Sequence, residues 1–170
     1  GHFVDKARIG QWKRLRSELP PPPMQDTGTG QRYAPAEAWS GPPRNTENPE
    51  LYSIFPYRIG VLGSAAFDTA RRSFLAREYK HDQGWAQDGI QAALLGLTDQ
   101  ARDSVTARLT TPSPYARFPA FWGPGFDWIP DQDHGGILLK AFQAMLIQAE
   151  PALGDEHDGE IHLLPAWPRD

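Results

Sequence analysis

The chain has 170 residues, of which 39% are hydrophobic and six are tryptophan, which is enough to bury one core in one domain. Its formal charge is -4 with both signs interspersed, so no basic patch points to a nucleic-acid partner, and no apolar run is long enough to span a membrane. The absence of cysteine excludes a disulfide framework and thiolate chemistry. It fits a periplasmic or secreted protein without establishing the compartment.

The first part of the chain combines one helical pattern with many breaks. Apolar residues at close to helical spacing predict a helix over residues 3–19, which the four consecutive prolines at 20–23 must end. The polar, glycine-rich residues 25–31 predict a loop, and residues 33–39 predict a short extended segment. The prolines at 49 and 56 leave room for at most one helical turn. Because the chain opens inside a helical pattern, we interpret residues 1–170 as one segment of a longer polypeptide.

Four later stretches have apolar residues on one helical face. They predict helices over residues 65–78, 85–97, 98–109 and 135–150, with Leu75 and Leu109 turned inward and Thr98 as an N-cap. Residues 159–164 predict a short strand. The expected fold class is therefore all-α: antiparallel helices whose variable loops gather at one end. Such loops suit a helical toroid, or a segment of one, better than a simple bundle, whose connections are short.

The most informative stretch is residues 111–136, which hold five prolines and six aromatic side chains before an acidic cluster. The prolines recur too closely for a helix or a central strand, and disordered segments are poor in aromatic residues. An ordered loop of this length is usually functional. Aromatic rings such as Trp122 and Trp128 can stack on the C–H faces of a sugar, while carboxylates act on its hydroxyl groups or on water.

The acidic cluster comprises Asp131, Asp133 and His134, directly before the helix predicted at residue 135. One interpretation is helix capping, because free N–H groups and the helix dipole favour anions there. The functional interpretation makes Asp131 the general base of an inverting glycosidase, which activates water while a carboxylic acid protonates the leaving oxygen. Asp133 and His134 would then bind substrate. A third interpretation is metal ligation, although adjacent groups rarely supply a whole site.

Two further polar groups are candidates for substrate contact. One lies around a proline and comprises Glu47, Asn48, Glu50 and Tyr52; the other lies at a predicted helix start and comprises Trp85, Gln87 and Asp88, after His81 and Asp82. A surface turn with one packed tyrosine, and a helix cap beside a core tryptophan, would explain the same residues without a function. The sequence contains no phosphate loop, dinucleotide fingerprint or zinc-protease motif, so we expect no cofactor and no metal.

Taken together and in order, several of these segments resemble glycoside hydrolase family 95, the inverting α-L-fucosidase and α-L-galactosidase group. Residues 50–56 (ELYSIFP) are similar to the family's HLYGLFP, and residues 70–74 with Gly84-Trp85 are similar to its AARKSLE…GW. Residues 128–136 (WIPDQDHGG) resemble FQIDGNFGG, residues 144–148 (AMLIQ) resemble EMLLQS, and residues 159–166 (GEIHLLPA) resemble IELLPALP.

The resemblance implies an (α/α)6 toroid, of which this chain would be the C-terminal half, and an exo-acting enzyme that removes a side-chain sugar from an oligosaccharide or polysaccharide. It places the catalytic base on Asp131. The family's general acid lies further upstream and has no match here. The remainder of the catalytic domain is then the expected partner, and this segment alone is expected to be inactive.

Two other functions remain open from the residues. A carbohydrate-binding or structural module would keep the aromatic platform without catalysis, and the changed neighbours Gln132 and Asp133 of Asp131 favour it. A polysaccharide lyase would need a tyrosine or histidine base and a group that neutralises a uronate, which Tyr115 and Arg117 could supply.

Overall fold

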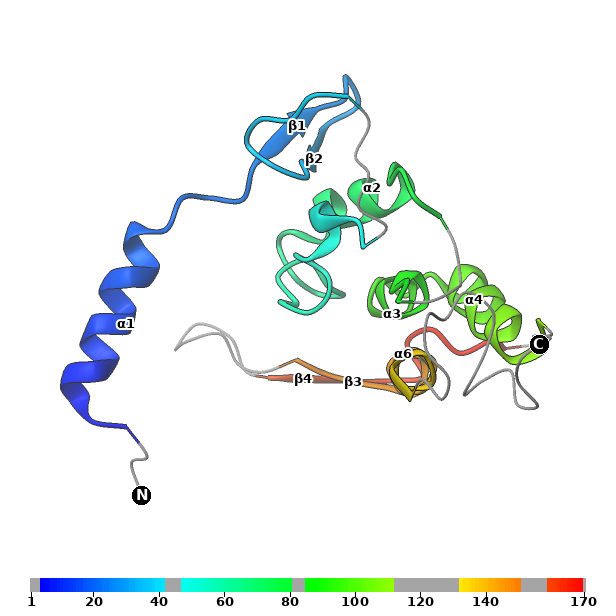
Figure 1. The fold of residues 1–170 in the computed structure, drawn as a ribbon. Coiled ribbons are helices and arrows are strands. Elements are labelled where there is room, and N and C mark those ends of the chain that lie inside the picture. The colour runs from blue at the N-terminus through cyan, green and yellow to red at the C-terminus, as the bar shows by residue number, and fades with distance from the viewer. Residues whose placement is uncertain (1–3, 42–46, 81–84, 112–131, 151–158, 170) are drawn as a thin grey trace.

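The structure is a computed structural model that describes residues 4–41, 47–80, 85–111, 132–150 and 159–169, and in which the side chains of residues 132–134 are not described. Figure 1 shows the order of its elements along the chain. Helix α1 (Lys6–Glu18) precedes a hairpin of β1 (Met24–Asp26) and β2 (Gln31–Tyr33) and a single 3-10 turn, η1 (Pro49–Leu51). Then follow α2 (Phe67–Leu75), α3 (Asp88–Leu94), α4 (Thr98–Thr110), α6 (Gln132–Leu146), β3 (Ile147–Glu150) and β4 (Glu160–Leu163).

The predicted fold class is wrong. The described residues form a mixed α/β arrangement, in which helices are accompanied by two small antiparallel sheets, and not an all-α toroid. Each sheet is a pair: β1 with β2, and β3 with β4. Strand β3 follows α6 without a break, so the last turn of the predicted helix over residues 135–150 is strand instead.

Helix α3 is the centre of the core, and every one of its residues is buried. It packs against α4 and α6 (Figure 1), and small residues allow the three helices to approach closely. A Cβ atom added to Gly89 would lie 2.8 Å from the Ser104 Oγ and 3.3 Å from the Ala141 Cβ. The surrounding core is formed by large apolar side chains from the neighbouring elements, among them Leu51, Ile54 and Phe74.

The β1–β2 hairpin is attached to α2 by hydrogen bonds between side chains and backbone. The Ser73 Oγ accepts from the Tyr33 N–H at 2.8 Å, and the Arg72 Nε donates to the Gln31 carbonyl at 2.9 Å. Between the strands, the Asp26 carboxylate accepts from the Gly28 N–H at 2.8 Å, and Gly28 has a φ of 77°, which favours glycine. The predicted loop over residues 25–31 is therefore confined to the turn at residues 27–30, because residues 25, 26 and 31 belong to the strands.

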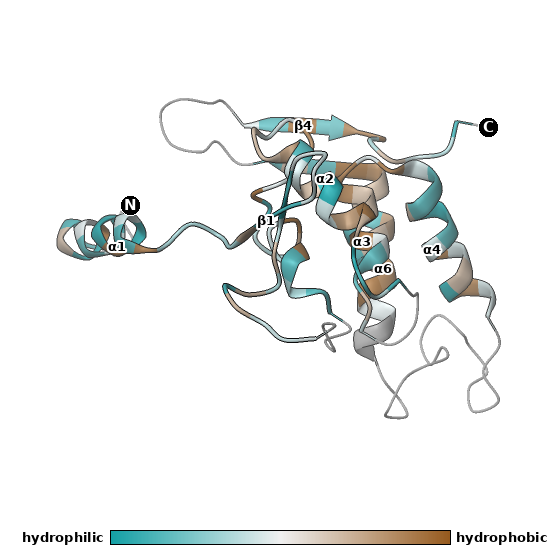
Figure 2. Cartoon of the chain, turned by 90° about the horizontal axis from the view of Figure 1, so that it is seen from above, coloured by the Kyte–Doolittle hydropathy of each residue, from teal (hydrophilic) through white to brown (hydrophobic). Residues whose placement is uncertain are grey.

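Helix α1 lies apart from all other elements in both views (Figures 1 and 2), and none of its residues is buried. Its start is fixed by Asp5, whose side chain accepts from the Arg8 N–H at 2.8 Å. The predicted helix over residues 3–19 is confirmed within the usual error at its ends.

Other helix predictions are right in kind and wrong in detail. Helix α2 is shorter than the predicted 65–78, and Leu75 is exposed. Helix α4 confirms the prediction over 98–109, but its N-cap is Leu97 rather than Thr98, and Leu109 is exposed. The single turn η1 between two prolines and the short strand β4 are both as predicted.

Candidate functional site

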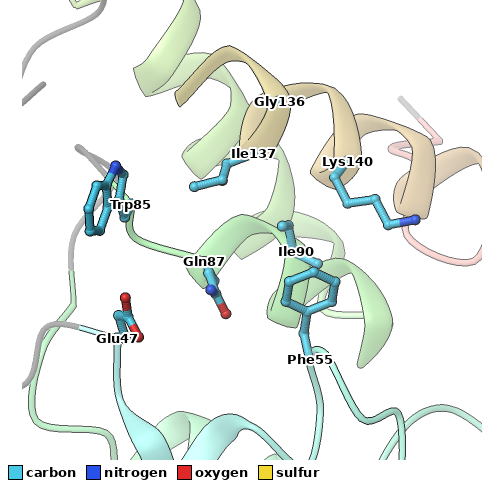
Figure 3. Close-up of a pocket in the computed structure, with 8 residues that line it drawn as sticks. All are labelled: Glu47, Phe55, Trp85, Gln87, Ile90, Gly136, Ile137 and Lys140. Atoms are coloured by element: carbon cyan, nitrogen blue, oxygen red, sulfur yellow. The ribbon is translucent and has the colours of Figure 1, made fainter. Parts of the chain in front are cut away.

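A pocket of about 510 Å³ lies between the segment around η1, the chain leading into α3, and the first half of α6 (Figure 3). Its described walls combine aromatic and aliphatic side chains with a carboxylate, an amide and a lysine side chain. They are formed by Glu47, Phe55, Trp85, Gln87, Ile90, Gly136, Ile137 and Lys140.

The aromatic side chains face the pocket from two sides. Trp85 and Phe55 lie at opposite sides in Figure 3, with Gln87 and Ile90 between them. Ile90 on α3 is fully buried and closes the base of the pocket, whereas Trp85 is half-exposed. An exposed tryptophan ring beside a pocket presents an apolar face to whatever binds there.

Glu47 is oriented by a neighbouring tyrosine. The Tyr52 hydroxyl donates to the Glu47 Oε2 at 2.5 Å. This hydrogen bond, with a smaller contribution from burial, raises the pKa of Tyr52 to about 12. The phenol is therefore protonated at neutral pH and holds the carboxylate in one orientation at the pocket wall.

Gln87 brings a buried acceptor to the pocket. Its backbone carbonyl accepts from the Gln91 N–H at 3.0 Å as α3 begins, and its side chain makes no cap hydrogen bond. The side-chain oxygen Oε1 is buried and has no hydrogen-bond partner among the described residues. A buried polar atom normally has a partner, so a donor from a ligand or a bound water would complete this site.

Asn48 stabilises the pocket wall through hydrogen bonds to the backbone of Tyr79. Its Nδ2 donates to the Tyr79 carbonyl at 3.0 Å, and its Oδ1 accepts from the Tyr79 N–H at 3.3 Å. Asn48 is buried, with a φ of 50° in the left-handed region, which asparagine tolerates better than most residues. These two hydrogen bonds fix the backbone next to Glu47. Asn48 does not line the pocket itself.

The structure places Glu50 and Asp88 in the interior rather than on the pocket wall. Burial raises the pKa of Glu50, while Arg32 and Arg77 oppose the shift. The Asp88 carboxylate pairs with the Arg77 guanidinium at 2.6 Å, and both side chains are almost completely buried. These contacts give Asp88 a structural role at the start of α3.

Several predicted site residues lie outside the described residues, so their positions stay predictions. They are the proposed base Asp131 and the side chains Trp122, Trp128, Asp133 and His134, together with His81 and Asp82. Helix α6 begins at Gln132 instead of residue 135, so the backbone of Asp133 and His134 forms its first turn. The pocket-lining Gly136 and Ile137 follow in the next turn.

Five lining residues were not singled out in the sequence: Phe55, Ile90, Gly136, Ile137 and Lys140. The spacing along helix α6 could have identified one of them. Lys140 stands four residues after Gly136, so the two share a helix face, and that face follows the acidic cluster at the start of α6. Phe55 and Ile90 gave no such signal, because buried and half-buried apolar residues recur throughout the chain.

Within the described part of the chain, no group of three or more His, Asp or Glu side chains could hold a metal ion. No helix there has the length and apolar character needed to cross a membrane. No protein-family model matches the sequence, and comparisons with curated proteins and with solved structures likewise found no significant match.

Proposed function

We propose that this pocket binds a sugar ring and that the chain contributes to hydrolysis of a glycosidic bond, in the manner of an inverting α-L-fucosidase-like enzyme. One observation carries the proposal. Glu47, Trp85 and Gln87, which the sequence nominated from two separate segments, line a single pocket together. The volume of about 510 Å³ is within the usual range for small-ligand sites.

The chemistry of the walls suits a sugar. A pyranose ring has an apolar face of C–H groups, for which Trp85 offers a partly exposed indole. Its hydroxyl groups both donate and accept. The Gln87 amide can donate and accept at the pocket wall, and the Glu47 carboxylate can accept.

For catalysis, we assign the general base to Asp131, which directly precedes α6 in the sequence. An inverting site needs a partner acid roughly 6.5–9.5 Å away, which leaves room for water. The partner acid is expected from another part of the catalytic domain. In a protein that contains both groups, Asp131→Asn should lower turnover by about 10²–10⁴-fold, because an amide cannot take the proton of the attacking water.

A second candidate is carbohydrate binding without catalysis. It is favoured by the carboxyl groups of the pocket: among its described lining residues only Glu47 has one, and that carboxylate already accepts the Tyr52 hydroxyl. An inverting mechanism needs two carboxyl groups, whereas binding needs neither.

Binding can be tested by titrating the chain with L-fucose, L-galactose and D-galactose while following tryptophan fluorescence and heat. Trp85→Ala should raise Kd by about 2- to 12-fold, the equivalent of one aromatic contact. Trp39→Ala is the matched control, because Trp39 is 44% exposed against 49% for Trp85 and does not line the pocket. If no sugar binds, or if both variants weaken binding equally, the pocket has been assigned wrongly.

Catalysis is tested separately with an aryl α-L-fucoside and NMR of the product before mutarotation. Release of a product with inverted configuration supports the hydrolase. Sugar binding without release, even when the upstream part of the catalytic domain is supplied, supports the second candidate. Release with retained configuration contradicts the assignment of Asp131 as the base of an inverting reaction.

A further inference from the structure

The β3–β4 sheet exposes its apolar face and turns its polar face inward, the reverse of most surface sheets. A sheet that packs on a core with one face normally turns its apolar side chains inward. Here the apolar residues face outward: Ile161 is 69% exposed and Leu163 is 73% exposed. Their opposite neighbours in the register, Ala149 and Ile147, are exposed as well. Because opposed residues and residues two apart share a face, all four lie on one side of the sheet.

The inward face of the same sheet is polar, and its β3 side chains bind the body of the protein. The buried Gln148 donates through Nε2 to the Ala93 carbonyl at 2.7 Å and to the Ala144 carbonyl at 2.9 Å. Two residues further along the strand, Glu150 accepts from the Arg58 Nε at 3.0 Å. The orientation of the sheet is therefore fixed by specific contacts, and its exposed apolar face is a built feature.

Helix α1 has an unpartnered apolar stripe that complements this face. Ile9, Trp12, Leu15 and the capping residue Leu19 recur at helical spacing and are all exposed. From Ile9 to Leu19 the stripe is about 15 Å long, at 1.5 Å per residue. From Ile147 to Glu150 strand β3 spans about 10 Å, at roughly 3.3 Å per residue, so the stripe is long enough to cross the whole strand.

The charges near the two surfaces differ in sign. From Asp5 to Leu19 the sequence has five basic residues and two acidic ones. The strands bring no charge to the apolar face, because Glu150 and Glu160 oppose each other on the inward face and Glu150 pairs with Arg58; the sequence between them has three acidic residues and no lysine or arginine. A basic helix therefore meets no like charge from the strands on this face.

Within one chain, α1 is held away from the sheet. The linker at residues 20–23 consists of prolines, which form a stiff, extended spacer. Its last residue is fixed, because the Pro23 carbonyl accepts from the Ala34 N–H at 2.9 Å beside the hairpin attached to α2. In Figures 1 and 2 the helix correspondingly stands clear of the body.

We propose that α1 of one copy covers the apolar face of β3–β4 in a second copy, and that the exchange is reciprocal in a two-fold symmetric dimer. Such an arrangement buries both exposed surfaces twice, which a one-sided contact would not. It does not depend on the sugar pocket, because neither surface contributes to it.

The proposal is tested by the mass of the full chain in solution. Light scattering after size exclusion should give about twice the monomer mass of 19.0 kDa. Trp12→Gln with Leu15→Gln on the helix, or Ile161→Thr with Leu163→Thr on the sheet, should each raise the dimer dissociation constant by more than about tenfold. Ile59→Thr is the matched control, because Ile59 is exposed but belongs to neither surface, and it should leave the dimer intact. Circular dichroism checks that each variant is folded.

A cross-link identifies the contact itself. The chain contains no cysteine, so Leu15→Cys combined with Ile161→Cys places one thiol on each surface, and a reciprocal dimer brings them together in two equivalent pairs. Oxidation should join two chains and give a dimer band that reduction removes, whereas Leu15→Cys combined with Ile59→Cys should give far less of it. A monomeric wild-type chain, a dimer unaffected by both sets of substitutions, or a cross-link within one chain would each overturn the proposal.

Discussion

Replacement of Arg77 by methionine tests whether the start of α3 is held by a buried ion pair. The Arg77 guanidinium lies 2.6 Å from the Asp88 carboxylate, and the two side chains are only 11% and 6% exposed. Arg77 also donates to the Phe74 carbonyl at 2.6 Å and lies 3.8 Å from the centre of the Phe74 ring. Removing one partner of a buried pair leaves the other charge desolvated, at a cost of about 3–5 kcal/mol.

That loss should be measurable by urea unfolding and by a thermal melt followed by tryptophan fluorescence and circular dichroism. For a domain of this size, each kcal/mol lowers Tm by about 2–4 °C, so Arg77→Met should melt roughly 6–20 °C below wild type. Arg102→Met is the control: Arg102 also contacts aspartates, at 3.0 Å and 2.8 Å, but these pairs are solvent-exposed and contribute little.

Asp88→Asn should also destabilise the protein, and the double variant should lose less than the sum of the two single losses, because the residues are in contact. If Arg77→Met melts no lower than Arg102→Met, the pair does not stabilise the fold as reasoned here. If Asp88→Asn instead leaves stability unchanged and weakens sugar binding, the sequence interpretation of Asp88 as a substrate contact is right and the structural one is wrong.

Two further predictions concern the pocket wall and the helix core. Because the hydrogen bond to Glu47 raises the pKa of Tyr52 to about 12, this pair stabilises the folded state fully below the ordinary tyrosine pKa of about 10, and its contribution is lost as the pH rises through 12. The difference in ultraviolet absorbance between wild type and Tyr52→Phe should show that midpoint; one near 10 would contradict the hydrogen bond. Gly89→Ala should destabilise by about 1–3 kcal/mol in urea unfolding, because its Cβ would lie 2.8 Å from the Ser104 Oγ. Gly10→Ala, in exposed α1 with nothing within 4 Å, should be neutral or stabilising, and equal effects at both glycines would refute the packing of α3.

The helices of the core were predictable because their signal is local. In α3 and α4 the pattern residues Ile90, Leu94, Ala101 and Val105 are buried as it requires, although the rest of α3 is buried as well and Leu109 of the α4 pattern is exposed. The ends were less predictable, since fraying and capping change them by a residue or two.

The strands depended on contacts that a local pattern does not contain. Residues 147–150 continue the helical period of α6, but they pair with residues 160–163 across a long separation in sequence, and this pairing decides their conformation. The β1–β2 hairpin was missed for a different reason. Its strands have three residues each, too few for an alternating pattern, and its turn depends on Gly28 and on the Asp26 side chain. The all-α fold class was wrong because three of the four strands, all except β4, have these weak signals.

The candidate site shows the same limit at the scale of single residues. Gln87 and Asp88 are neighbours in sequence, yet Gln87 lines the pocket while Asp88 pairs with Arg77 inside the core. A helix turns by about 100° per residue, so adjacent polar residues at its start point to different surroundings. Composition can nominate the segment that forms a site, but the first turn of the helix decides which of its side chains a ligand can reach. The pocket therefore depends on α3 being fixed at its start, and the buried Arg77–Asp88 pair is one of the contacts that holds the Gln87 amide against the sugar proposed to bind there.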